Sequence, residues 1–267
     1  MNNIPSLPSN DDFQYFSHLY HSEQLIKLEE WSADTNWVTS DREAYRQNTL
    51  FQNDNSYIAN KRVIDLGCHH GYYCYIAKTL GATSVHGINA RQWPLDVANF
   101  AFNQLHQDNF SFKQGNLENN EFLKKELVDK DTVIFTEVLE HLRNPYAIFE
   151  TITNSNVKNL IFQCSIADAH LGTPLLVYYK QSTESNFSVF EEDKTIGMGS
   201  YPNLPWLTMV LYHLGWSIEL LEESSIFNRD WFAIPNLDKF PPIVLPTVTI
   251  LAKKFASNID KNNFENY

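Results

Sequence analysis

The stretch Val63-Ile64-Asp65-Leu66-Gly67-Cys68-His69-His70-Gly71 decides the fold of this chain. Its β-branched start fits a buried strand, and residues 72–80 have the apolar spacing of a helix that ends at Gly81. Gly67 allows a sharp turn close to a ligand, and the helix start offers unpaired N–H groups to an anion. The stretch therefore predicts a nucleotide-type cofactor loop between a strand and a helix. Two glycines alone fit an ordinary strand-to-helix turn equally well, so the rest of the chain has to decide.

Strand and helix patterns alternate downstream of this loop. Such alternation predicts an α/β fold with a doubly wound, mostly parallel sheet and helices on both faces. A later helix and two final strands would complete a Rossmann-like sheet of seven strands. We expect strands at 62–66, 84–88, 110–113, 132–136, 159–164, 217–221 and 247–252, and helices at 72–80, 94–106, 121–127, 145–153 and 206–214.

The same patterns divide the chain into five segments. After Cys164 the strand–helix rhythm stops, and many Gly, Pro and polar residues indicate a long insertion instead of another strand–helix unit. The C-terminal residues are polar and rich in Asn. We expect an N-terminal helical cap (1–60), a cofactor-binding core (61–166), a lid or substrate insertion (167–205), the C-terminal part of the core sheet (206–256) and a tail (257–267).

Composition limits the function classes. A chain of 267 residues with 43% hydrophobic residues can bury one sizeable core. The net charge of −12 argues against a nucleic-acid partner, because phosphate binding needs clusters of Lys and Arg. Three cysteines without a CxxC pair predict a reduced, cytoplasmic protein. The N-terminus has no signal-like apolar core, and no segment reaches about 18 uninterrupted apolar residues, so we expect no membrane association. Nothing in the sequence indicates an oligomeric state.

Four motifs, in order along residues 61–253, resemble those of the class I S-adenosylmethionine-dependent methyltransferases, in particular the EVLEH-type small-molecule enzymes. The motifs are Asp65-Leu66-Gly67-Cys68 with Gly71, Gly87-Ile88-Asn89, Gly115-Asn116-Leu117, and the FTEVLEHLRNP segment at 135–145. This resemblance implies methyl transfer from S-adenosylmethionine to an O or N nucleophile of a small metabolite. A dehydrogenase is disfavoured because the Gly-x-Gly-x-x-Gly pattern is absent.

The resemblance also implies where the cofactor binds: the first motif beside its methionine part, the second at the ribose and the third along the adenine. Asn89 and Asn116 stand where the family usually has carboxylates, and His69 replaces a common glycine. Because an amide has one acceptor oxygen, we expect weaker cofactor binding. The implied cofactor-binding residues are Asp65, Gly67, Cys68, His69, Gly71, Tyr72, Asn89, Ala90, Asn116, Leu117 and Glu137.

The candidate catalytic residues are Glu140, His141 and His70. Methyl transfer is an in-line displacement, so alignment matters most and a base is optional. His141 has an ordinary pKa suited to removing a proton at neutral pH, and His70 beside the cofactor loop is a second choice. The structural alternatives are that Glu140 caps the next helix or pairs with Arg143, and that both histidines only shape their loops.

Three other functions stay open at this point. Glu137, Glu140 and His141, with His170, resemble the Mg²⁺-binding set of small-RNA 2′-O-methyltransferases, although the acidic composition opposes this and we expect no metal. Parts of the first loop also resemble tRNA wobble-uridine modification enzymes, which makes an RNA methyltransferase the alternative enzyme. A non-catalytic scaffold that keeps the cofactor fold is the third.

Overall fold

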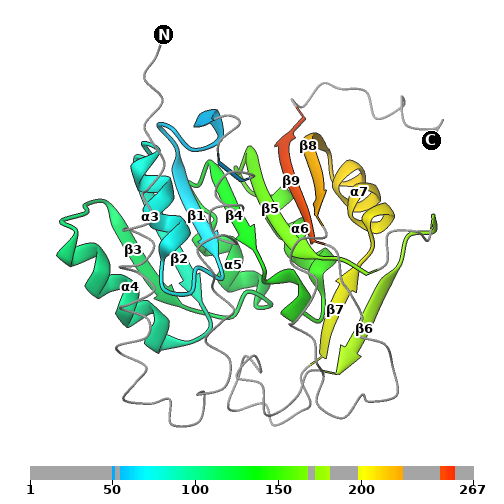
Figure 1. The fold of residues 1–267 in the computed structure, drawn as a ribbon, viewed down its shortest axis with the longest axis horizontal. Coiled ribbons are helices and arrows are strands. Elements are labelled where there is room, and N and C mark those ends of the chain that lie inside the picture. Colours follow the sequence, from blue (N-terminus) through cyan, green and yellow to red (C-terminus); the bar gives the residue numbers. More distant parts are fainter. Residues whose placement is uncertain (1–49, 52–54, 168–171, 181–197, 225–246, 256–267) are drawn as a thin grey trace.

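The structure is a computed structural model that describes residues 50–51, 55–167, 172–180, 198–224 and 247–255 (Figure 1). Most of the predicted helical cap, part of the predicted insertion and the predicted tail lie outside these residues. A short 3₁₀ helix, η2 (Asn55–Tyr57), precedes the first strand.

A seven-stranded sheet forms the centre, with the strand order β3-β2-β1-β4-β5-β9-β8. The first five strands pair in parallel, and β9 runs antiparallel between β5 and β8. The predicted sheet is confirmed, with small shifts at the strand ends. Its strands are β1 (Arg62–Leu66), β2 (Ser84–Asn89), β3 (Phe110–Gln114), β4 (Thr132–Thr136), β5 (Asn159–Ser165), β8 (Trp216–Ser224) and β9 (Thr247–Lys254).

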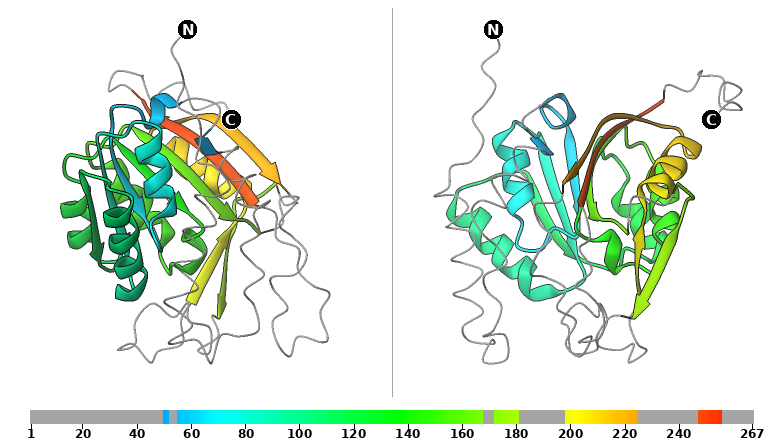
Figure 2. Two further views of the ribbon diagram at one scale, coloured as in Figure 1. Left: turned by 60° about the vertical axis from the view of Figure 1, so that its left-hand side comes forward. Right: turned by 45° about the vertical axis from the view of Figure 1, so that its right-hand side comes forward.

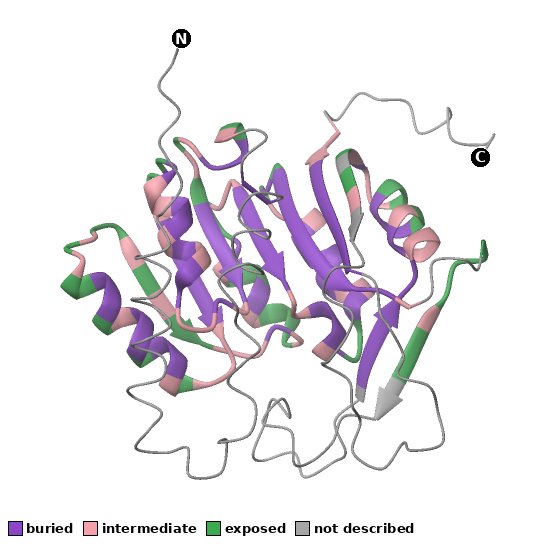
Figure 3. Ribbon diagram, viewed as in Figure 1, coloured by how far each residue is buried: buried purple, intermediate pink, exposed green. Residues whose placement is uncertain are grey.

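Helices cover both faces of the sheet (Figures 1 and 2). Neighbouring residues of β1 face opposite sides: Val63 packs with residues of α3 and α4, and Ile64 with residues of α5, α6 and α7. The central strands are therefore buried on both faces, as Figure 3 shows. The helices are α3 (Tyr72–Thr79), α4 (Gln92–Gln104), α5 (Asn120–Glu126), α6 (Pro145–Thr153) and α7 (Leu204–His213).

The predicted insertion contains two strands that the sequence patterns missed. β6 (Leu176–Lys180) and β7 (Met198–Pro202) form their own antiparallel sheet, which projects from the carboxyl edge of the main sheet (Figures 1 and 2). The hydroxyl of Ser200 donates to the carbonyl of Leu142 at 2.9 Å, beside the short helix η3 (Leu139–His141). Asn203 fastens the base of this ribbon, because its amide donates to the carbonyl of Thr173 at 2.8 Å. We call β6 and β7 the β6–β7 ribbon.

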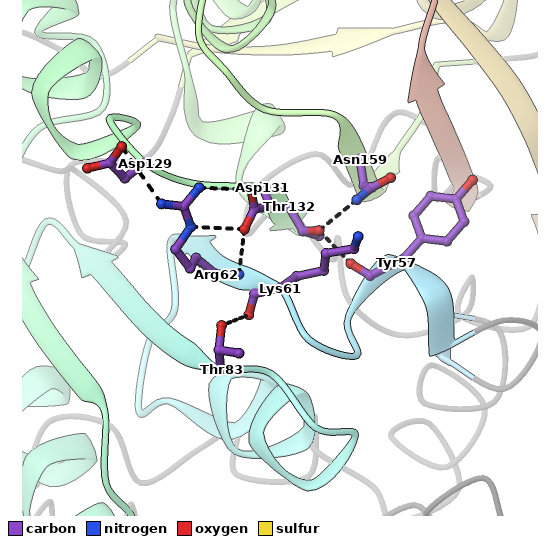
Figure 4. A network of polar contacts seen from close by, with 8 residues as sticks. All are labelled: Tyr57, Lys61, Arg62, Thr83, Asp129, Asp131, Thr132 and Asn159. Atoms are coloured by element: carbon purple, nitrogen blue, oxygen red, sulfur yellow. Dashed lines mark hydrogen bonds and ion pairs between the residues drawn. The ribbon is translucent and has the colours of Figure 1, made fainter. Parts of the chain in front are cut away.

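A polar network holds the amino-terminal ends of β1, β4 and β5 together (Figure 4). The carboxylate of Asp131 accepts hydrogen bonds from the backbone N–H and the guanidinium of Arg62, at 2.9 to 3.0 Å. The amide of Asn159 donates to the hydroxyl of Thr132 at 3.1 Å. Because the strands are parallel, their carboxyl ends meet at the opposite edge, where ligands bind in folds of this kind.

Candidate active site

The loop between β1 and α3 is shaped by three residues with positive φ. Gly67 has φ 88°, His69 has φ 50° and Gly71 has φ 84°. A Cβ on Gly67 would lie 2.1 Å from Cγ2 of Val138, so only glycine fits between the first and fourth motifs. The N–H groups of Gly67 and Cys68 both donate to the carbonyl of Ile88, at 2.8 and 2.9 Å. The loop, which follows β1, thus lies where the strand order reverses, between β1 and β4.

Asp65, near the end of β1, is a carboxyl group in an apolar setting. It is 1% exposed, and burial raises its pKa to about 7, while a hydrogen bond from Cys74 acts in the opposite direction. The thiol of Cys74 lies 3.6 Å from Oδ2. Within the described ranges, no Lys, Arg or His forms an ion pair with this carboxylate. A buried carboxylate in that situation favours a cationic ligand.

His69 and His70 are brought together in the loop. Their Nδ1 atoms lie 2.8 Å apart, and the ring of His69 meets the ring of Trp93 edge-on at 5.6 Å. Burial lowers the pKa of His69 well below its usual value, and His70 and Arg91 lower it further. At neutral pH one imidazole therefore donates and the other accepts. Cys68 and Tyr72, also predicted to contact the cofactor, are buried in the core on the α3 side of the sheet.

The second and third motifs meet at the ends of β2 and β3. The N–H of Gly115 donates to the carbonyl of Asn89 at 3.0 Å, and Gln114 donates to the carbonyl of Ala90 at 2.8 Å. The side-chain NH₂ of Asn89 donates to the carbonyl of Arg91 at 3.4 Å, a bond in which Oδ1 takes no part. Oδ1 of Asn116 accepts from the N–H of Glu118 at 2.8 Å, so part of its acceptor capacity serves the turn. Leu117, the next residue, is buried.

The fourth motif turns sharply after β4. Glu137 has φ 53°, and its N–H donates to the carbonyl of Gln163 at 2.8 Å. Glu140 in η3 is 5% exposed. Burial lowers the pKa of His141 to about 4, with Glu137 acting against this shift and Arg91 adding to it. The expectation of a near-neutral pKa for His141 is therefore wrong, and its imidazole is uncharged at pH 7.

This pKa predicts an acid-sensitive contribution to stability. Because the pKa in the folded protein lies below the unfolded value of 6.5, the unfolded chain binds the proton first as the pH falls. The stability contributed by neutral His141 is thus complete above about pH 6.5 and is lost toward pH 4. We expect His141→Gln to reduce the loss of unfolding free energy between pH 7 and pH 5 by about 2 kcal/mol. Urea unfolding of both proteins at the two pH values measures this difference, and equal losses would contradict it.

Glu118 is a site residue that sequence reasoning missed. Its carboxylate accepts hydrogen bonds from the N–H of Arg143 at 2.8 Å, the N–H of Asn144 at 3.1 Å and the guanidinium of Arg143 at 3.1 Å. The side chain of Asn144, and not that of Glu140, caps α6. An acidic residue two positions after Asn116 in the third motif was the available signal.

The described residues contain neither a group of metal ligands nor a helix that could span a membrane. Within them, no three His, Cys, Asp or Glu side chains are grouped to hold a metal ion, and His170 lies outside them. In the same part of the chain, every helix is too short or too polar to cross a bilayer.

Several solved structures have the same fold and align with this chain over most of its length and most of their own. The N-terminal domain of EvdMO1, solved with SAH (S-adenosylhomocysteine) and D-fucose, has a TM-score of 0.57 at 12% identity and covers 93% of this chain and 100% of its own. Magnesium protoporphyrin IX methyltransferase (ChlM) from Synechocystis PCC 6803, with bound SAH, has a TM-score of 0.54 at 17% identity and covers 91% and 97%. The [4+2]-cyclase SpnF has a TM-score of 0.54 at 13% identity and covers 95% and 99%. At these identities the likeness shows the fold alone.

Sequence comparison identifies the family. A comparison with curated proteins gives no match. The family described as "Methyltransferase domain" matches residues 58–199, which is more than half of the chain and includes all four motifs. The chain therefore belongs to the methyltransferase-domain family and, as a member of it, is an S-adenosylmethionine-dependent methyltransferase.

Proposed function

We propose that the acceptor is a small metabolite with an O or N nucleophile, bound beside Glu140 and His141. The observation that carries this proposal is the β6–β7 ribbon against η3. Ser200 is fully buried where it bonds to Leu142, and Tyr201 is 8% exposed. The ribbon thus covers one side of the segment that contains η3 and Leu142. This limits the space beside that segment, which favours a small acceptor over a large one. The net charge of −12 also disfavours a nucleic acid.

We assign the cofactor contacts as follows. S-adenosylmethionine, when bound, supplies an electrophilic methyl group on a sulfonium ion. Asp65 would hold its ammonium group, which matches a buried carboxylate whose pKa burial has raised to about 7. Oδ1 of Asn89 would accept from the ribose, and Asn116 and Leu117 would lie along the adenine. The remaining assigned contacts are Gly67, Cys68, His69, Gly71, Tyr72, Ala90 and Glu137.

We assign proton removal to His141. Its uncharged imidazole can accept a hydrogen bond from a hydroxyl or amine, which orients the nucleophile. The pKa of about 4 makes it a weak base, so the proton moves as the nucleophile gains positive charge. Glu137 raises the pKa of His141 and so favours the imidazolium that forms. Glu140 and the paired His70 are the further candidates for polar contact with the acceptor.

The test uses cofactor with a labelled methyl group. The purified protein is incubated with a metabolite fraction below about 1 kDa or with total tRNA, and the label is followed into each. We expect label in the metabolite fraction, and a rate about 10²-fold lower in His141→Gln, a typical loss for a general base. His213→Gln, on the exposed surface of α7, is the matched control and should keep the rate.

Two results would overturn the proposal. Label in tRNA would favour the RNA methyltransferase. In that case the binding of tRNA to the protein should weaken steeply as the salt concentration rises. Tight SAH binding without label in either fraction would favour the scaffold.

We also propose a reduced cytoplasmic location, which suits the free, buried thiols of Cys68, Cys74 and Cys164. The division into cap, core, lid and tail stays a prediction.

A further inference from the structure

We infer that Glu118 is a positioning residue that couples cofactor binding to the placement of the acceptor-side segment 139–144. This inference rests on the proposed roles of Asn116 and His141. It concerns a residue that touches neither the cofactor nor the acceptor and acts through the two loops that do.

The first half of the coupling lies in the third motif. Oδ1 of Asn116 accepts from the N–H of Glu118 at 2.8 Å, and the backbone carbonyl of Asn116 accepts from the N–H of Asn119 at 3.0 Å. Asn119 in turn caps α5. These bonds make a single turn, so a ligand that orders Asn116 also fixes the direction of the Glu118 side chain.

The second half lies in the fourth motif. The carboxylate of Glu118 accepts from two consecutive backbone N–H groups, those of Arg143 and Asn144, which lie 25 and 26 positions further along the sequence. Asn144 is the N-cap of α6, where the helix dipole favours an anion. The guanidinium of Arg143 bonds to the other carboxylate oxygen. The Glu118 side chain is only 16% exposed, so water competes weakly for these bonds.

Two anchors therefore hold the three residues that directly follow His141. On one side Ser200 of the β6–β7 ribbon bonds to the carbonyl of Leu142, and on the other Glu118 holds residues 143 and 144. If Glu118 shifts, segment 139–144 keeps its hydrogen bond to Ser200 of the β6–β7 ribbon. It loses its hydrogen bonds to Glu118, which connect it to the proposed adenine-binding motif. The imidazole would then no longer keep a fixed distance from the cofactor.

A carboxylate elsewhere in the chain makes the same kind of contact and provides a matched control. Asp131 accepts from the backbone N–H and the guanidinium of Arg62, as Glu118 does from Arg143, but at the amino-terminal edge of the sheet (Figure 4). A purely structural role of Glu118 predicts that Glu118→Ala and Asp131→Ala have similar consequences. Coupling predicts that only the first changes the response of residues 139–144 to ligand.

The experiment measures amide hydrogen exchange of the full chain with and without saturating SAH. In the wild type and in Asp131→Ala, we expect SAH to slow exchange at 139–144 by about tenfold. In Glu118→Ala, SAH should still bind, within about threefold of the wild-type affinity, since this side chain is not a ligand contact. The slowing at 139–144 should be lost. Glu118→Gln keeps an oxygen for the two backbone N–H groups and should restore part of it.

Unchanged slowing in Glu118→Ala would overturn the inference. If that variant does not fold, Glu118→Gln decides: slowing equal to the wild type overturns the inference, and weaker slowing supports it. SAH binding to the wild type without slowing at 139–144 would refute the coupling alone. Absence of SAH binding to the wild type would refute the proposed cofactor contacts as well.

Discussion

Replacing Asp65 with Asn should make the ligand-free protein more stable near pH 8 and should abolish tight binding of SAH. Asp65 is 1% exposed, and burial raises the pKa of its carboxyl group to about 7. Above that pH the folded protein holds a buried charge, which destabilises it until a cation binds. The amide of Asn removes this charge and, with it, the attraction for the ammonium group of the cofactor.

The direction of the pH dependence of stability follows from the folded and unfolded pKa values of Asp65. The folded pKa of about 7 lies above the ordinary 3.8, so the folded state holds its proton longer and stability is lost as the pH rises from 3.8 to 7. We expect Asp65→Asn to raise the free energy of unfolding by roughly 2–4 kcal/mol near pH 8. At pH 5 this difference from the wild type should be smaller by about 2 kcal/mol or more. The loss of SAH affinity should be about 10²-fold or more, typical of breaking a buried ion pair.

Denaturant unfolding at both pH values and calorimetric titration with SAH measure the two effects. Asp131→Asn is the control with the same chemical change, at a carboxyl group whose pKa Arg62 lowers. That variant should lose stability and keep SAH binding. A less stable Asp65→Asn protein near pH 8 would show that the carboxylate has a compensating partner.

Gly67→Ala should give the largest loss of stability among glycine substitutions in the described loop. An alanine at φ 88° is strained by about 1–2 kcal/mol. Its Cβ would also lie 2.1 Å from Cγ2 of Val138, and such overpacking costs about 1–3 kcal/mol. We expect a total near 3 kcal/mol in urea unfolding, together with weaker SAH binding because the loop must move.

A second substitution separates the two causes. Val138→Ala removes the nearest carbon atom, so the double variant should lose about 1–2 kcal/mol less than the sum of the single variants. The φ strain would remain. Gly172→Ala is the matched control, because a Cβ there meets nothing within 4 Å. Strictly additive losses would show that the loop relaxes away from Val138 without cost.

The sheet and the place of the site were predictable because their signals are local. The β-branched run before Asp65, and Gly67 and Gly71 after it, specify a strand and a turn by themselves. Parallel pairing then brings the ends of β1, β2 and β4 to one edge. The cofactor follows from the family, and the motifs that resemble it are contiguous in sequence.

Non-local features were not predictable. The bond between Glu118 and Arg143 joins residues 25 positions apart, and no periodic pattern reports it. The pKa of about 4 for His141 comes from burial, which depends on how distant segments pack. β6 was missed because its Leu-Val-Tyr-Tyr run follows Gly172 and Pro174, which indicate a loop.

The β6–β7 ribbon bears on how this enzyme could acquire a new substrate. Its two strands pair only with each other, so none of their backbone bonds belongs to the ladder of the main sheet. Ser200 and Asn203 provide its described side-chain ties to η3 and α7. We expect that the segment between Thr173 and Asn203 can be replaced by the corresponding segment of a relative without loss of stability in the main sheet.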